Sequence, residues 1–175
     1  MLNFLDYICE QKGEWPGNYV AARTEDPVIP KNLLPKSGTV PEGKSHITLM
    51  YSMFSCVDGR ILDNFIKTVP HDFQVTPTDF ECFDAKGDNE GKAAVVMCVS
   101  HPFLQTMHDS LKTLGMEHSY PEFKPHITIA YDVDLDEAYE VRDRLRDWLV
   151  NGNSNPINTI EIYHEPVDKE WSKKL

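Results

Sequence analysis

Two short segments of the chain repeat each other and carry residue types that can transfer protons. His46-Ile-Thr-Leu-Met-Tyr51 recurs 80 positions later as His126-Ile-Thr-Ile-Ala-Tyr131, with His, Ile, Thr and Tyr at matching places. If both segments are strands, each His shares one face with the Thr two residues on, and the aliphatic residues take the other face. We expect the aliphatic face to enter a core and the two His-Thr faces to line a cleft.

A pair of imidazoles suits phosphodiester cleavage. The unperturbed pKa of His is about 6.5, so one ring can act as base while the other acts as acid. The base takes a proton from an attacking 2'-hydroxyl or water, and the acid protonates the departing oxygen. Thr48 and Thr128 lie on the same face as His46 and His126, where their hydroxyls can donate to phosphate oxygens. A zinc site is disfavoured because no H-E-x-x-H or Cys pair completes a ligand set.

Length and charge limit the class of protein and the partner. The 175 residues fit one domain, 1–175, that is large enough to bury a core. The net charge of −11 repels long polyanions, which argues against binding to long nucleic acid. A small phosphorylated substrate needs only a local cluster of positive groups and backbone donors.

Cysteine spacing and hydropathy predict the compartment. The four cysteines are widely spaced and contain no C-x-x-C, which predicts reduced, buried thiols: Cys9, Cys56, Cys82 and Cys98. The first residues lack a positive start and a long apolar run, and no stretch suits a membrane span. We therefore expect a cytoplasmic protein without a membrane partner.

The elements predicted to position the motifs alternate between strands and helices. Strands are predicted over 18–23, 44–52, 93–100 and 157–163, with two extended pieces over 73–75 and 79–83 that Pro77 separates. Helices are predicted over 2–11, after Asp58 with an apolar stripe of Ile61, Leu62, Phe65 and Ile66, from Pro102 to Gly115, and over 136–150. The segment 25–43 is rich in Pro and Gly and is predicted to be a loop, with a role as a lid left open.

The order of these elements repeats together with the motif. Each His-bearing strand is followed by a helix and then by another strand, which indicates an internal duplication. Two similar α+β lobes that share a cleft bring His46 and His126 to face each other.

The paired motifs SHITLMY and PHITIAY resemble those of the two-histidine (2H) phosphoesterases, the LigT-like superfamily. The resemblance covers nearly the whole chain, since the opening strand NYVAAR, the first motif, its helix and the second motif follow that superfamily's order. It implies a bilobal α+β fold, with antiparallel sheets lining a central cleft and helices outside. It also implies phosphodiester chemistry that needs no metal or other cofactor, with His46, Thr48, His126 and Thr128 as the catalytic set.

Within this superfamily the chain is similar to the phage anti-CBASS nucleases, which destroy cyclic oligonucleotide signals. The Tyr that closes each motif, the NYVAAR opening, the small size and the acidic balance carry this resemblance. It implies cleavage of 3',5' linkages in cyclic di- and trinucleotides by attack of the neighbouring ribose hydroxyl, in the host cytoplasm. We expect the protein to be a monomer or a weak oligomer.

Three alternatives stay open. The first is a 2',3'-cyclic or 2',5'-oligonucleotide phosphodiesterase that acts on short RNA ends. The second is a non-catalytic sponge that binds nucleotides in the same cleft. The third is an interaction protein that uses the acidic helix 136–148.

Strand parity extends the predicted site to substrate-binding residues. If Val20 and Ala22 point inward, Tyr19 faces the cleft, and if Ile160 and Ile162 point inward, so does Glu161. Tyr19 or Phe83 could stack on a nucleobase, and Glu161 could accept a hydrogen bond from an amino group. Lys44 and Lys124 lie two residues before their histidines and could neutralise phosphate. For all of these, a packed aromatic ring or a solvated charge is the competing interpretation. The remaining histidines are expected to be structural: His71, His101, His108, His118 and His164.

Overall fold

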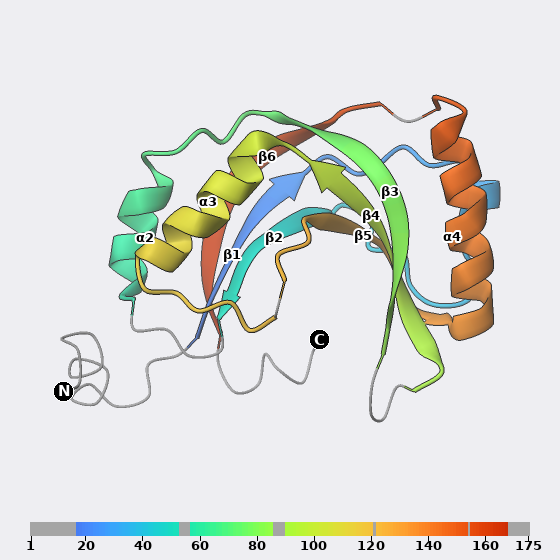
Figure 1. Ribbon diagram of the computed structural model, residues 1–175, viewed down its shortest axis with the longest axis horizontal. Helices are drawn as coiled ribbons and strands as arrows, with labels where there is room; N and C mark the ends of the chain where they lie inside the picture. Colours follow the sequence, from blue (N-terminus) through green and yellow to red (C-terminus); the bar gives the residue numbers. More distant parts are fainter. Residues whose placement is uncertain (1–16, 53–56, 86–89, 121, 154, 168–175) are drawn as a thin grey trace.

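The computed structural model describes residues 17–52, 57–85, 90–120, 122–153 and 155–167, which form one α+β arrangement of strands and helices (Figure 1). The strands are β1 (Gly17–Thr24), β2 (His46–Ser52), β3 (Gln74–Asp84), β4 (Lys92–Ser100), β5 (His126–Asp134) and β6 (Ile157–Val167). The helices are the short 3-10 helix η1 (Lys31–Leu33) and the α-helices α2 (Gly59–Ile66), α3 (Pro102–Thr113) and α4 (Leu135–Val150).

The six strands pair antiparallel in the order β1-β2-β5-β4-β3-β6, and β6 returns to β1 to close the ring. The predicted α+β class is confirmed. We expected separate antiparallel sheets, but two contacts join the strands into one ring. One contact pairs Ile47 of β2 with Ile127 of β5, and the other pairs residues 74–75 of β3 with 157–158 of β6. The two motif strands, β2 and β5, are therefore neighbours in the ring.

The predicted repeat of strand, helix and strand is present along the chain, as β2-α2-β3 and as β5-α4-β6. In space the two repeats are interlocked. The strand β3 follows the first motif, yet it pairs with β4 beside the second motif, whereas β6 pairs with β1 beside the first motif. The helices follow the same exchange, since α2 packs on β6 and α4 packs on β3 (Figure 1).

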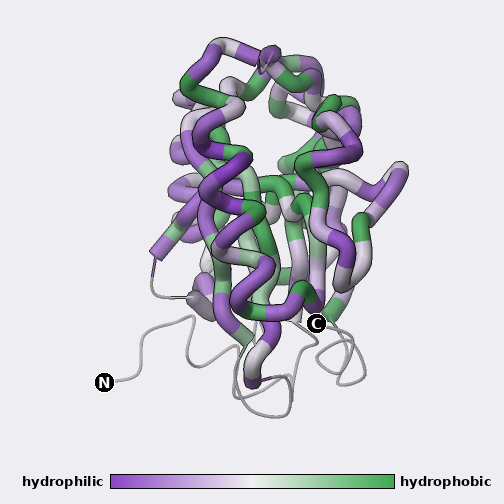
Figure 2. Tube along the Cα trace, turned by 90° about the vertical axis from the view of Figure 1, so that its right-hand side faces the viewer, coloured by the Kyte–Doolittle hydropathy of each residue, from purple (hydrophilic) through white to green (hydrophobic). Residues whose placement is uncertain are grey.

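The two faces of the motif strands differ as predicted. Ile47, Leu49, Ile127 and Ile129 are at most 4% exposed and belong to the main hydrophobic core. Residues from α2, α3 and α4 complete this core, so the helices cover the aliphatic face of the strands. In Figure 2, where α4 faces the viewer, hydrophobic segments lie mainly on the strands behind this largely hydrophilic helix. The His-Thr face is thus the face that the helices leave uncovered.

Helix boundaries follow the capping signals in the sequence. Asp58 caps α2 by accepting a hydrogen bond of 2.8 Å from the Arg60 N–H. α3 begins at Pro102, with His101 as the N-cap residue, and Gly115 follows its end at φ +103°. The predicted apolar stripe of α2 is wrong at Ile61, which is 52% exposed, because the eight-residue helix buries only Leu62 and Ile66.

Two strand predictions need correction. Pro77 does not divide its segment, because β3 runs from Gln74 to Asp84 and absorbs the proline in a register shift between Pro77 and Asp79. Ile160 does not point inward and is 54% exposed, because the pairing of β6 with β1 also shifts register there. Beyond this shift, Ile162 is buried as expected.

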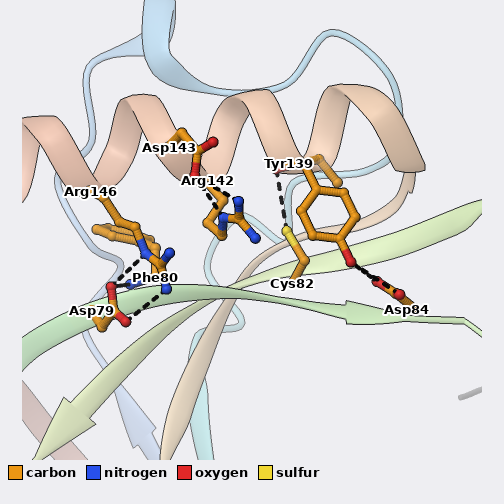
Figure 3. Close-up of polar contacts among 9 residues, drawn as sticks. Asp79, Phe80, Cys82, Asp84, Tyr139, Arg142, Asp143 and Arg146 are labelled. Carbon is orange, nitrogen blue, oxygen red and sulfur yellow. Dashed lines mark hydrogen bonds and ion pairs between the residues drawn. The ribbon is translucent and has the colours of Figure 1, made fainter.

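A set of polar contacts fixes α4 on β3 (Figure 3). The Arg146 guanidinium donates to both carboxylate oxygens of Asp79, at 2.8 and 2.9 Å. The Tyr139 hydroxyl donates to Asp84, and the Cys82 thiol donates to the Ala138 carbonyl at 3.3 Å. Since Cys82 and Asp84 point toward α4, alternation directs their neighbours Glu81 and Phe83 to the face that carries the two motifs.

The segment 25–43 is a loop, as predicted, and its middle is anchored. The Glu137 carboxylate at the start of α4 accepts hydrogen bonds from the Lys36 N–H and from the N–H and hydroxyl of Ser37. These bonds, that of the Ser37 hydroxyl first, lower the pKa of Glu137 to about 2. Thr39 then exchanges two backbone hydrogen bonds of 2.9 Å with Tyr131. The loop therefore ties the end of β5 to α4.

Some expectations fall outside the described residues, namely the helix over 2–11 and the environments of Cys9 and Cys56. Cys82 and Cys98 are free and partly buried. Burial is the main cause that raises the pKa of Cys98 to about 11, so its thiol is unreactive at neutral pH. In the part of the chain that the structure describes, no helix is long and apolar enough to cross a membrane.

Candidate active site

The four motif residues meet at the seam between β2 and β5. Because Ile47 pairs with Ile127 in an antiparallel register, His46 lies opposite Thr128 and Thr48 lies opposite His126. Opposite residues have Cβ atoms about 4.5–5.5 Å apart, and diagonal neighbours such as the two histidines about 7–8 Å apart. All four side chains are partly buried. The register thus places two imidazoles and two hydroxyls in one compact square.

Both imidazoles are held in the same way by the backbone. Nδ1 of His46 lies 3.0 Å from the carbonyl oxygen of Lys44, and Nδ1 of His126 lies 2.6 Å from that of Lys124. A carbonyl only accepts, so each Nδ1 carries a proton, and in the neutral ring Nε2 keeps the lone pair. The repeated spacing of two residues produces both contacts. Each histidine can therefore exchange a proton through Nε2.

The surroundings of His126 favour its neutral form. Burial is the main cause that lowers the pKa of His126, and the nearby His46 lowers it further, against the opposing effect of the Lys124 carbonyl. The ring of Phe83 contributes to this burial. The two rings meet edge to face, with their centroids 4.8 Å apart. His126 is therefore biased toward the neutral form, which is the form that accepts a proton.

Tyr19 lies behind the first motif on the same face. Its ring is 5% exposed and meets His46 edge-on at 6.0 Å between centroids. Its hydroxyl lies 3.4 Å from the hydroxyl of Thr48. Burial raises the pKa of Tyr19 well above its usual value, so the phenol stays protonated. Tyr19 lies on the face of the motif residues, but it is packed in a small aromatic cluster with Tyr51 and Tyr163, which is the competing interpretation of a packed aromatic ring. Its contact with a nucleobase stays a prediction.

Two ion pairs flank the square of motif residues. Lys124 lies 3.5 Å from Glu81 of β3, and Arg23 lies 3.0 Å from Glu161 of β6. Arg23 is the strand partner of both His46 and Glu161, which puts all three in one row across β2, β1 and β6. The Arg23 guanidinium also lies over the ring of Tyr163, at 5.6 Å from its centroid.

The structure brings most of the predicted residues together. Tyr19, Phe83 and Lys124 each touch a motif residue or lie within two positions of one, and Glu161 lies in the row of His46. The Lys44 side chain is exposed, and the backbone carbonyl of Lys44 accepts the hydrogen bond from His46 Nδ1. Sequence reasoning missed Glu81, although Glu81-Cys-Phe83 recurs as Glu161-Ile-Tyr163 at the motif spacing of 80 residues.

The other histidines have partners elsewhere. Their Nδ1 or Nε2 atoms contact the Ile66 carbonyl and Ile162 N–H (His71), the Phe103 N–H (His101), the Leu49 carbonyl (His108), the Tyr51 N–H (His118) and Asp63 (His164). These contacts support the structural roles expected for them. Among the described residues, no three His, Cys, Asp or Glu side chains are grouped closely enough to hold a metal ion.

The fold and the site define an α+β protein in which two His-x-Thr strands pair at the centre of an antiparallel ring. Residues 29–174 match the family model described as "Anti-CBASS protein Acb1", and the chain belongs to this family. It is similar to the Acb1 protein of Vibrio phage KVP40, with 29% identity over 95% of each chain. It is also similar to that of Salmonella phage S16, with 27% identity over 91% of this chain and 93% of the relative.

A solved structure has the same fold. The chain is similar to Kluyveromyces marxianus Usb1, with a TM-score of 0.51 over 87% of this chain and 95% of that one. The sequence identity in this comparison is 10%, so the likeness concerns the arrangement of the backbone alone.

Proposed function

We propose that this protein is a metal-independent phosphodiesterase that cleaves 3',5' linkages in cyclic di- and trinucleotide signals and thereby counters CBASS immunity. One observation carries the proposal: two imidazoles with equivalent backbone contacts at Nδ1 flank one seam, and each ring can transfer a proton through Nε2. Membership of the Acb1 family supports the anti-CBASS role. We propose accordingly that it acts in the cytoplasm of the host cell.

We assign His126 as the base and His46 as the acid, because burial and the neighbouring ring favour neutral His126. Nε2 of His126 takes the proton of a ribose 2'-hydroxyl, whose oxygen attacks the adjacent phosphorus. The bond from phosphorus to the 5' oxygen breaks, and His46 gives its proton to this leaving oxygen. Thr48 and Thr128 donate to the non-bridging oxygens as charge builds up there. The product end is a 2',3'-cyclic phosphate.

The two halves of the ring are proposed to be pseudo-symmetric lobes of a single domain, β6-β1-β2 with α2 and α3, and β3-β4-β5 with α4. Support comes from the equal spacing of the repeated residues and from the matched Nδ1 contacts. A cyclic dinucleotide has two similar halves. A pseudo-twofold site surrounds each half with an equivalent set of residues.

The proposal is tested by incubating purified protein with a panel of 3',5'-, 2',5'- and mixed-linkage cyclic and linear dinucleotides in EDTA. We expect mass spectrometry to find linear products with a 2',3'-cyclic phosphate end from the 3',5'-linked rings. His46→Ala and His126→Ala should each lower kcat by at least about 100-fold, since each removes one proton transfer. Turnover that requires added metal overturns the proposal.

The same panel separates the alternatives. Selective cleavage of 2',5' linkages or of terminal 2',3'-cyclic phosphates identifies the RNA-end activity. Tight binding with intact ligand in both the parent and the His46→Ala, His126→Ala double variant identifies a sponge. The acid–base assignment predicts that the acidic limb of the kcat/KM profile reflects His126 and is displaced when Phe83→Leu makes this ring more solvated.

A further inference from the structure

A second duplication lies on the site face, separate from the His-x-Thr motif. Glu81-Cys-Phe83 on β3 recurs as Glu161-Ile-Tyr163 on β6, again 80 residues later. The helices between motif and repeat differ in length, since α2 has 8 residues and α4 has 16. The spacing from each His to its Glu is nevertheless the same.

The repeated residues occupy corresponding places on the two sides of the seam. β3 and β6 each lie two strands away from the nearest His-bearing strand, at a spacing of about 4.8 Å per strand. Phe83 contacts His126, and Tyr163 contacts Tyr19, which contacts His46. Each side therefore carries a partly buried aromatic ring connected to its own histidine.

The carboxylates are compensated in the same manner. Glu81 faces Lys124 at 3.5 Å, and Glu161 faces Arg23 at 3.0 Å. Both acids remain partly accessible, with 33% and 45% of the side chain exposed. Exposed ion pairs of this kind contribute little to stability. A carboxylate on a face that binds phosphate repels the phosphate. The paired cation offsets this repulsion, and the exposed carboxylate oxygens can still accept a hydrogen bond from a ligand.

We propose that Glu81 with Phe83 and Glu161 with Tyr163 form two equivalent base-binding half-sites, one for each nucleoside of a cyclic dinucleotide. In each half-site the aromatic ring packs against the base, and the carboxylate accepts a hydrogen bond from its exocyclic amine. This adds Glu81 and Tyr163, as residues that determine base specificity, to the predicted Phe83 and Glu161. The substrates favoured are dinucleotides with an amino-bearing base on both sides. This inference rests on the proposed function only for the class of ligand.

The test uses equilibrium binding, which needs no turnover. Affinity is measured by calorimetry on the His46→Ala, His126→Ala background for 3',3'-cyclic di-AMP and for its analogue in which both adenines are replaced by purine, which lacks the amine. Each lost hydrogen bond to a charged acceptor should weaken binding by about 10- to 100-fold. Because the analogue lacks both amines, it should bind more weakly than cyclic di-AMP by about 100-fold or more.

The variants Glu81→Ala and Glu161→Ala should each reduce this preference for the amine by about tenfold or more, and the two together should abolish it. Using the ratio of the two affinities cancels any general effect of the freed Lys124 or Arg23 on phosphate binding. Glu140→Ala, on the helix that covers the opposite face, is the matched control and should leave the ratio unchanged. If Glu81→Ala leaves the ratio at its parental value, the half-site proposal is overturned.

Failure of the proposed function gives a different result. If the parent protein cleaves neither ligand but its preference for the amine depends on Glu81 and Glu161, the half-site proposal is supported and the proposed enzymatic function is overturned. If the parent protein cleaves cyclic di-AMP but binds it without any preference for the amine, the enzymatic function is supported and the half-site proposal is overturned.

Discussion

At the scale of single residues, Tyr19 connects the buried aromatic cluster to the site. Its hydroxyl lies 3.4 Å from that of Thr48, and no charge is involved because burial raises the pKa of the phenol. Removing the hydroxyl leaves the ring packing intact and deprives Thr48 of an orienting partner. The effect should therefore appear in catalysis more than in folding.

We expect Tyr19→Phe to lower kcat by roughly three- to tenfold, which corresponds to the loss of one neutral hydrogen bond. Steady-state kinetics on a cyclic dinucleotide measures the change, with thermal unfolding as the check on stability. Tyr120→Phe is the matched control, because Tyr120 is an exposed tyrosine whose ring neighbours Tyr51. An equal loss in both variants contradicts the role of the Tyr19 hydroxyl.

At the scale of elements, the anchored loop depends on one glycine. Gly38 has φ +78°, and a Cβ there lies 2.3 Å from the Tyr131 carbonyl oxygen. Gly152 has a similar φ of +73° with open space around it. The two positions separate the cost of the backbone conformation from the cost of the steric clash.

Gly152→Ala should reduce the free energy of unfolding by about 1–2 kcal/mol, the cost of the left-handed conformation alone. Gly38→Ala should cost clearly more, because the loop must also move away from β5. Chemical denaturation of the two variants measures the difference. Equal destabilisation would mean that the contact between the loop and Tyr131 is not rigid.

The docking of α3 on β2 is predicted to be sensitive to acid. His108 of α3 donates a hydrogen bond of 2.8 Å from Nδ1 to the Leu49 carbonyl oxygen of β2, and its ring stacks on Phe123. The adjacent His118 lies 4.9 Å from the His108 ring and accepts from the Tyr51 N–H. Burial first, and then His108 and Lys112, lower the pKa of His118 from 6.5 to about 4.

Between these two pKa values the unfolded chain binds a proton that the folded protein excludes. Stability should therefore fall as the pH drops from 6.5 toward 4, and this contribution is fully present above 6.5. His118→Gln keeps an acceptor for Tyr51 and does not titrate, so its unfolding free energy should depend less on pH in this window. Denaturation curves measured at several pH values compare the two proteins, and parallel pH profiles would refute the assignment.

At the scale of the whole molecule, net charge limits the size of the ligand. The chain carries −11, and two cations that lie close to motif residues, Arg23 and Lys124, are paired with acids. A long RNA meets the repulsive field of the whole surface, whereas a cyclic dinucleotide meets only the local donors.

We expect a single-stranded RNA of about 30 nucleotides to show no measurable binding between about 50 and 200 mM salt, where proteins that neutralise many phosphates lose affinity steeply. Fluorescence anisotropy measures this, with a labelled cyclic dinucleotide as the positive control. A steep decrease of RNA affinity with salt would show a basic track that the charge balance does not suggest.

Local sequence signals were enough to predict most strands and helices and the shared face of His and Thr in each motif. Strand alternation separated the His-Thr face from the aliphatic face. The N-cap residue Asp58 and the first-turn residue Pro102 marked the helix starts, because these signals act within a few residues. Local signals failed at Pro77 and Ile160, where strand pairing inserts a register shift that depends on a distant partner.

The way in which the two repeats combine follows from contacts between distant parts of the chain. The pairing of Ile47 with Ile127, the exchange of β3 and β6 between the halves, and the pairing of Glu81 with Lys124 all join residues far apart in the chain. Such contacts form when the closed ring of strands satisfies its backbone hydrogen bonds and buries one shared core. Periodicity along a single strand holds no information on which neighbour that strand selects.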